Sequence, residues 1–376
     1  MELDYLSQHE EDLNGEEANS LELPSGRLVT DKELLFIEQE LKTLNAGENG
    51  FFPLPLCHLV HFNALPCDIY QENHHEPGFI GRFSLAWPKG RVFTQTDVTT
   101  LDQPEKALGY VSAAEVDQVL QTFLYFLERD LFVSRVTSLD QIKLLTDLII
   151  LWMNNFFLHT LGQNSEQYHL GAKLMEKLCG LISPMPSPGA VLMPLRHPES
   201  GIHAHSLNVC LISLAFIHFL GFTAPMASLF GLGALLHDIG MVLFARDIVS
   251  KEGCLSPEDI VEIKAHPTLG DNLLRKVAGI PQEVLLMVSQ HHENLDGSGY
   301  PVGLRDGQIH PWARMLRVID SYESITALRP WRAPFPPDRA LVIVKTAWKA
   351  KPDYEPRFLQ FFILFLEAIQ AQQALS

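Results

Sequence analysis

Residues 291–301 read His-His-Glu-Asn-Leu-Asp-Gly-Ser-Gly-Tyr-Pro, and this stretch is the most informative in the chain. Neighbouring side chains on a helix diverge by about 100°, so His291 and His292 cannot both line one narrow helical face. At the end of a helix, however, both imidazoles can reach a compact ion. The glycines allow the backbone to approach a ligand closely, and Pro301 stiffens the exit of the turn. Taken alone, the string also fits a polar surface loop.

A second stretch, Ala-Leu-Leu-His-Asp-Ile-Gly, occupies residues 234–240 and ends an apolar helical segment in His237 and Asp238. This pair supplies one nitrogen and one carboxylate, and a carboxylate can bridge two metals. The two motifs, in this order, resemble the HD-GYP family of metal-dependent phosphodiesterases that act on cyclic di-GMP. The resemblance runs from about His197 to about Phe362.

Three further positions match the metal-binding pattern of that family. His205 opens an apolar helix 32 residues before His237. His266 stands in His-Pro-Thr-Leu-Gly, and Asp320 follows His291 by 29 residues. The resemblance implies that His237 and Asp238 are the catalytic pair. It also implies one metal held by His205, His237, Asp238 and Asp320, and a second held by Asp238, His266, His291 and His292.

Imidazole and carboxylate ligands with open positions suit iron or manganese, the metals that the resemblance implies, and leave zinc open. Two such ions generate hydroxide at neutral pH and hold a phosphodiester for in-line attack. The resemblance further implies that Tyr300, Arg329 and Arg332 contact the substrate, since Arg binds phosphate oxygens through paired hydrogen bonds. Without the resemblance, solvated surface charges explain the two Arg equally well. We therefore expect two divalent ions and a cyclic dinucleotide substrate.

The sequence departs from the family pattern at three positions. Met241 stands where a Lys usually follows His-Asp-x-Gly, which removes one cation near the scissile phosphate. Gly201 replaces the Glu that binds a third metal in some members, so a binuclear site is predicted. Glu199, four residues before His203, leaves a shifted register open. Glu323 replaces a second Asp, which is a mild change.

These departures leave more than one function open. The first is a cyclic di-GMP phosphodiesterase that yields pGpG or GMP. The second is a degenerate module that holds metal and cyclic di-GMP and signals through protein partners, and Met241 is the residue that favours it. The third is a metal-dependent hydrolase of another nucleotide, which the intact Gly-Tyr-Pro disfavours.

The composition is that of a globular chain. Of its 376 residues, 47% are hydrophobic and 19% are charged, which allows a large core in two or three domains. The formal net charge of −17 argues against DNA or RNA as a partner. The five Cys show no CxxC spacing and the N-terminus is acidic, so we expect reduced thiols, no signal peptide and a cytoplasmic location. The apolar runs at 144–158 and 358–369 are interrupted or too short for a membrane span, which favours core helices.

Charge and periodicity divide the chain into four parts. Residues 1–30 are predicted to be a disordered acidic tail, and 31–135 a small α+β regulatory domain. Residues 136–190 are predicted to be a helical connector that ends at a Pro-rich break, and 191–376 an all-α HD-GYP domain. A homodimer or a signalling-protein partner stays open. The expected segments are β-prone stretches at 51–62, 65–71 and 79–87, and helices at 31–46, 111–129, 136–183, 203–220, 226–246, 256–265, 268–278, 281–292, 311–328, 337–350 and 355–372.

The remaining His residues show no recurring ligand spacing. His218 is expected to be a packed residue, and His203 the start of a helix. Four His of the predicted α+β domain are interpreted as surface or partly buried residues, because spacing alone is a weak indication of a metal site. They are His58, His61, His74 and His75.

Overall fold

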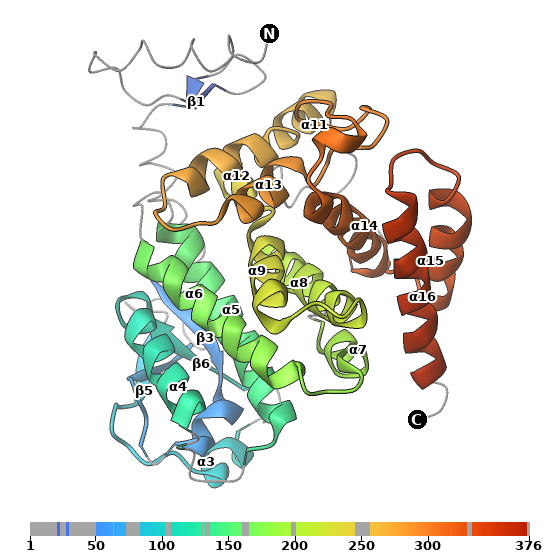
Figure 1. The fold of residues 1–376 in the computed structure, drawn as a ribbon. Helices are drawn as coiled ribbons and strands as arrows, with labels where there is room; N and C mark the ends of the chain where they lie inside the picture. Colours follow the sequence, from blue (N-terminus) through green and yellow to red (C-terminus); the bar gives the residue numbers. More distant parts are fainter. Residues whose placement is uncertain are drawn as a thin grey trace.

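The structure is a computed structural model. It describes residues 21–22, 28–29, 50–62, 64–72, 83–101, 107–129, 131, 136–159, 165–196, 201–244, 256–328 and 333–373. The predicted class is confirmed: a small antiparallel sheet with its own helices precedes a larger part built from helices (Figure 1).

The α+β part is a four-stranded antiparallel sheet in the order β3-β6-β4-β5. Its strands are β3 (Phe51–Pro55), β4 (Ile69–Glu72), β5 (Phe83–Trp87) and β6 (Leu108–Ser112). Phe52 pairs with Val111 in the register of β3 and β6, and both side chains are buried. Helix α4 (Val116–Arg129) buries the apolar stripe that its periodicity predicts. The short helix α3 (Gln95–Thr99) begins with a capping box formed by Thr94 and Asp97.

Two predictions for this part are wrong in detail. A helix was expected from residue 111, but Leu108–Ser112 form β6, and only η4 (Ala113–Glu115) separates this strand from α4. The second half of the β-prone stretch 51–62 is the 3-10 helix η2 (Leu56–His61). Leu56 and Leu59 are both buried there, and their spacing of three is the repeat of a 3-10 turn.

The N-terminal predictions fall largely outside the described residues. Within the expected acidic tail, β1 (Leu21–Glu22) and β2 (Leu28–Val29) form a short antiparallel pair. The helix predicted at 31–46 lies outside the described residues, as do His74 and His75. His58 is buried against Asp147, with its Nε2 atom 2.5 Å from a carboxylate oxygen.

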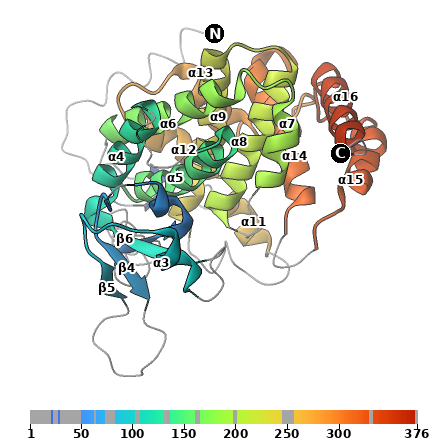
Figure 2. The same cartoon turned by 90° about the horizontal axis from the view of Figure 1, so that it is seen from below.

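Two long helices, α5 (Ser138–His159) and α6 (Ser165–Ile182), lie between the sheet and the larger helical part (Figures 1 and 2). Helix α5 packs against both β3 and α4. The indole N–H of Trp152 on α5 donates to the carbonyl of Gln167 on α6 at 2.7 Å. A side chain on Gly171 would collide with this indole, so a glycine allows the two helices to approach closely.

The larger part contains helices only among its described residues, as predicted. Helices α8 and α9 pack together, α12 lies against η7 and α13, α13 lies against α9, and α14 lies against α8 and α13. Helices α15 and α16 are on the side away from the sheet (Figures 1 and 2). The elements are α7 (Pro188–Leu192), η6 (Met193–Leu195), α8 (Ile202–Phe219), α9 (Ala224–Leu236), η7 (Ile239–Leu243), α11 (Pro257–Ile263), α12 (His266–Arg275), α13 (Gln282–Gln290), η8 (Asp306–Gln308), α14 (Pro311–Thr326), α15 (Pro337–Ile343), η9 (Val344–Trp348) and α16 (Pro356–Gln373).

Two segments are long and apolar enough to cross a membrane by composition alone. They are Ile202–Phe219, with a mean hydropathy of 1.4, and Ala224–Leu243, with 1.6. Inside the protein 78% of the first and 72% of the second are buried, as in core helices of a folded domain. The runs at 144–158 and 358–369 lie within α5 and α16.

Candidate metal centre

All the side chains predicted as metal ligands converge on one place, although they come from five separate segments. Helices α8 and α14 each present one of them, and the others stand at the end of α9, at the start of α12 and at the end of α13. In the first group, one potential ligand atom from each residue lies within 4.8 Å of the others, and the group consists of Asp238, His266, His291 and His292. The second group, by the same measure, consists of His205, His237 and Asp238. The Asp320 carboxylate adjoins the second group, 3.3 Å from Nε2 of His205.

Asp238 occupies the middle of the cluster. Its Oδ1 atom lies 3.1 Å from Nε2 of His266 and 3.5 Å from Nε2 of His291. Its Oδ2 atom lies 3.4 Å from Nε2 of His205 and 3.5 Å from Nε2 of His237. The two oxygens thus face different sets of imidazoles, which is the arrangement that a bridging carboxylate requires.

Backbone contacts set the tautomers of three imidazoles. Nδ1 of His237 and Nδ1 of His266 each lie 2.7 Å from the carbonyl three residues earlier, and Nδ1 of His291 lies 2.8 Å from the corresponding carbonyl. A carbonyl oxygen only accepts, so Nδ1 carries the proton and Nε2 keeps its lone pair. All three Nε2 atoms point towards Asp238. The donor set therefore fits a divalent metal ion.

His205 is held in a different way. Its Nδ1 atom lies 2.5 Å from Oε2 of Glu323, and Oε1 of Glu323 accepts a hydrogen bond from the Asn208 amide at 3.2 Å. Burial acts to lower the pKa of His205, but the carboxylates of Glu323, Asp238 and Asp320 raise it well above 6.5. In the sequence Glu323 is a mild replacement for Asp, and its contact with His205 is not evident there.

The other charges suit metal binding. Burial acts to raise the pKa of Asp238 and of Asp320, but the surrounding His residues, His237 and His205 foremost, lower both well below the usual range. Burial lowers the pKa of His237 to about 4, and burial with the neighbouring imidazoles lowers that of His292 well below 6.5. Ionised carboxylates and neutral imidazoles are the ligand states that divalent metals require.

Tyr300 of the Gly-Tyr-Pro motif packs on the cluster. Its ring stacks on His292, with centroids 4.6 Å apart and planes at 24°. The Lys264 ammonium lies 5.4 Å from the Tyr300 ring centroid. Burial raises the pKa of the Tyr300 hydroxyl well above 10, so it stays protonated and can donate a hydrogen bond to a ligand.

Glu293 fastens the loop that carries Tyr300, a role that is not evident from the sequence. Its carboxylate is buried and accepts hydrogen bonds from the backbone N–H groups of Val302, Gly303 and Leu304, at 2.8, 3.2 and 2.9 Å. The third residue of His-His-Glu therefore holds the chain on the far side of the Gly-Tyr-Pro turn.

Only part of the cationic surroundings predicted for the cluster lies among the described residues. Arg329 and Arg332 lie outside the described residues. Met241 is half-buried in η7, and its N–H donates to the Asp238 carbonyl at 2.8 Å. Arg317 on α14 was not singled out from the sequence, yet its charge acts on His292 and on Tyr300.

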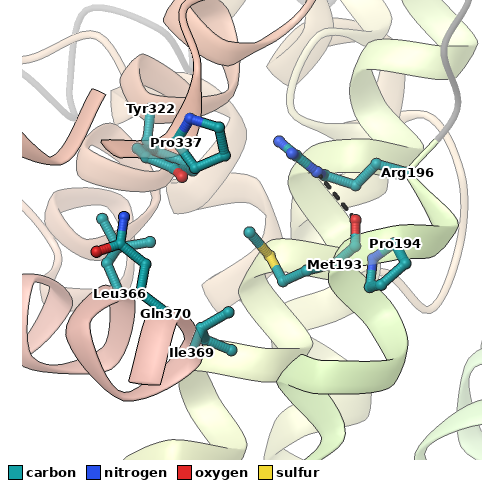
Figure 3. Close-up of a pocket in the computed structure, with 8 residues that line it drawn as sticks. All are labelled: Met193, Pro194, Arg196, Tyr322, Pro337, Leu366, Ile369 and Gln370. Carbon is teal, nitrogen blue, oxygen red and sulfur yellow. Dashed lines mark hydrogen bonds between the residues drawn. The ribbon is translucent and has the colours of Figure 1, made fainter. Parts of the chain in front are cut away.

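A separate cavity of about 250 Å³ lies between η6, α14 and α16 (Figure 3). Arg196 at its edge donates to the Met193 carbonyl at 3.2 Å and to the Thr326 hydroxyl at 3.0 Å. Apolar side chains make up most of its lining, and none of the predicted ligands lines it. It is therefore distinct from the metal centre.

Residues 214–355 match the model of the HD domain family. The chain contains an HD domain. Curated relatives include the cyclic di-GMP phosphodiesterase PA4108 of Pseudomonas aeruginosa, 32% identical over 175 residues, which are 46% of this chain and 41% of that protein. A cyclic di-GMP phosphodiesterase of Thermotoga maritima is 30% identical over 162 residues, 43% of this chain and 44% of that protein. The 3'3'-cGAMP-specific phosphodiesterase 3 of Vibrio cholerae is 35% identical over 112 residues, 30% of this chain and 24% of that protein.

The resemblance to HD-GYP phosphodiesterases that the motifs predict is confirmed by these matches. The chain spans less than half the length of each of these relatives. Bd1817, a HDG"Y"P protein from Bdellovibrio bacteriovorus, has a similar structure, with a TM-score of 0.62 at 19% sequence identity. That similarity covers 84% of this chain and 99% of the other, so the shared fold extends beyond the HD domain.

Proposed function

We propose that this HD domain is a metal-dependent phosphodiesterase that hydrolyses a cyclic dinucleotide, cyclic di-GMP foremost, to pGpG or GMP. Two divalent ions, iron or manganese, would be held around Asp238, with His205, His237 and Asp320 on one side and His266, His291 and His292 on the other. The observation that carries this proposal is that the two oxygens of Asp238 face two separate sets of buried imidazoles.

When bound, the metal pair supplies an activated water and polarises the phosphate. The protein contributes order and charge. Backbone carbonyls hold His237, His266 and His291 with Nε2 directed at Asp238, so little reorganisation is needed on binding. Glu323 orients His205 and accepts its Nδ1–H. The Tyr300 hydroxyl, kept protonated by burial, can donate a hydrogen bond to the nucleotide.

The test is hydrolysis of cyclic di-GMP by protein loaded anaerobically with Fe(II) or Mn(II), with the metal counted on the same sample. About two ions per chain and turnover are expected. The 3'3'-cGAMP substrate is assayed in parallel, because relatives with either specificity match this chain. Turnover of 3'3'-cGAMP alone would change the substrate and keep the reaction class.

The His291→Ala variant connects the metal to the activity. His291 is fully buried, and its Nε2 atom lies 3.1 Å from Nε2 of His266. Its loss should remove at least one ion and lower turnover by at least about 100-fold. His218→Ala is the control, because His218 sits at the end of α8 and its side chain has one hydrogen bond among the described residues, with the Ser183 carbonyl at 3.3 Å. Unchanged metal content and turnover in His291→Ala would rule the proposal out.

Met241 supports a second candidate, a module that binds metal and cyclic di-GMP and signals through a protein partner. An apolar, half-buried side chain stands there in place of a cation beside the site. Two bound ions, tight binding of cyclic di-GMP by calorimetry and no product would favour this candidate over the enzyme.

A further inference from the structure

Arg317 connects the two halves of the candidate metal centre. It precedes Asp320 by three residues on α14, so both side chains lie on the same face of the helix. Its Nε atom donates to the Asn294 side-chain oxygen at 3.2 Å, and Asn294 is two residues after His292. Its Nη1 atom donates to the Ser321 hydroxyl at 2.9 Å, beside Asp320. The guanidinium is thus fixed beside ligands from both α13 and α14.

The partners of Arg317 are all neutral, which is unusual for a half-buried cation. Besides Asn294 and Ser321, it faces the ring of Tyr354, whose centroid is 5.5 Å from the guanidinium carbon. It has no carboxylate partner among the residues that the structure describes. By contrast, Arg314 on the same helix pairs with Glu355 at 2.9 Å.

A guanidinium has five N–H donors in a planar fork that matches the oxygens of a phosphate. The described contacts of Arg317 use one donor on Nε and one on Nη1, so Nη2 keeps its donors for another acceptor. Asn294, Ser321 and Tyr354 hold the side chain in place without neutralising it. The Arg317 guanidinium is therefore preorganised to bind an anion.

We propose that Arg317 binds a phosphate group of the nucleotide at the metal centre and supplies the positive charge that Met241 does not. This inference rests on the proposed function, because it concerns the same site. It makes Arg317 a substrate-binding residue and predicts that the site retains phosphate affinity despite the Met at position 241.

The experiment measures binding of inorganic phosphate to Mn(II)-loaded protein by isothermal titration calorimetry. Arg317→Gln should weaken phosphate binding by about tenfold or more, and Arg317→Lys should recover part of the loss. Arg275→Gln is the matched control. Arg275 ends α12, roughly 13 Å along the helix from His266, and pairs with Asp271 at 2.8 Å. Metal content and melting temperature, measured on each variant, separate a binding defect from a folding defect.

A second arm introduces the cation that the sequence lacks. Met241→Lys should tighten phosphate binding in the Arg317→Gln background and restore the affinity at least in part. Equal phosphate affinity in the wild-type protein and Arg317→Gln would overturn the inference, as would an absence of phosphate binding by the wild type. Turnover of cyclic di-GMP is recorded separately. If the Arg317→Gln variant hydrolyses cyclic di-GMP with the same KM as the wild type, the role of Arg317 is refuted and the proposed function stays intact.

Discussion

Glu323 determines whether His205 can serve as a ligand. Its carboxylate is buried and lies 2.5 Å from Nδ1 of His205. Glu323→Gln keeps the volume but removes the charge that fixes the ring, so metal affinity should fall about 10–100-fold. Competition with a metal-binding dye measures the metal affinity of each variant. Glu367→Gln is the control, because Glu367 is exposed and pairs with Lys345. Equal affinity in Glu323→Gln would mean that a neutral side chain at position 323, or the fold alone, is enough to orient His205.

His203 should make the stability of the protein depend on pH. Its Nε2 atom is buried without a hydrogen-bond partner among the described residues, and its ring packs on Phe157 with centroids 5.0 Å apart. Burial lowers the pKa of His203 from 6.5 to about 4. The folded protein therefore binds this proton less tightly than the unfolded chain. Its contribution to stability is complete above pH 6.5 and is lost as the pH falls from 6.5 towards 4, by up to about 3 kcal/mol.

The comparison with His203→Phe isolates this effect, because burial also lowers the pKa of His237 and of His292, which therefore reduce stability in the same pH range. Phenylalanine keeps the packing against Phe157 and cannot titrate. Denaturant unfolding of metal-free protein at pH 7, 6, 5 and 4 should show a shallower fall in the free energy of unfolding for the variant. If the free energy of unfolding fell equally with pH in both proteins, a group other than His203 would be responsible for the fall.

The predicted ligands could be singled out from the sequence because each lies within or beside a short local motif, as His237 and Asp238 do. A motif does not show which contacts the residues that support these ligands make. Glu323 is 118 residues from His205, and their contact exists only because α14 packs against α8. Arg317 could not be recognised either, since nothing in its neighbourhood distinguishes it from Arg314, which forms an ion pair.

Gly240, the glycine of His-Asp-Ile-Gly, sets the distance between η7 and α12. A Cβ atom on Gly240 would collide with the His266 carbonyl and lie 2.7 Å from the Gly270 nitrogen. Both obstacles are backbone atoms, so α12 itself would have to move, and His266 with it. Gly240→Ala should lower the free energy of unfolding by about 3 kcal/mol and reduce metal content.

Gly180 provides the matched control for this substitution. It lies near the end of α6 with open space around it, so Gly180→Ala should stabilise the protein by about 0.5–1 kcal/mol. Thermal unfolding and metal analysis on both variants check the pair. A Gly240→Ala protein with full stability and metal content would show that α12 tolerates displacement.

Most element predictions followed from periodicity, and the errors occur where two elements adjoin. Long helices such as α8 and α14 were found within a few residues because their apolar repeats are long. The last two residues of β6, Val111 and Ser112, were assigned to a helix because only three residues separate this strand from α4. Only pairing with β3 and β4 identifies it as a strand, and that pairing involves residues roughly 40–60 positions away.

For the whole molecule, the boundary predicted near residue 190 stays a prediction, and the packing favours a larger folding unit. One contiguous buried cluster includes Phe52 in the sheet and Ile369 in α16. Helix α9 has no charged residue, and α6 covers part of it. A side chain on Gly231 would lie 2.8 Å from the Met175 sulfur, so the contact between α6 and α9 is close. A helix that is apolar on all sides needs partners on all sides.

A fragment of residues 191–376 should therefore fail to fold alone, whereas residues 50–376 should fold and bind metal as the full chain does. Removal of α5 and α6 exposes the apolar surfaces of α8 and α9, and exposed patches of this kind cause aggregation. Size-exclusion chromatography, binding of a hydrophobic dye and metal analysis on both fragments provide the measurement. If the shorter fragment were monomeric and held the metal content of the full chain, α5 and α6 would be a separable connector. Its aggregation, with the longer fragment intact, would make these two helices part of the structure that holds the metal centre together.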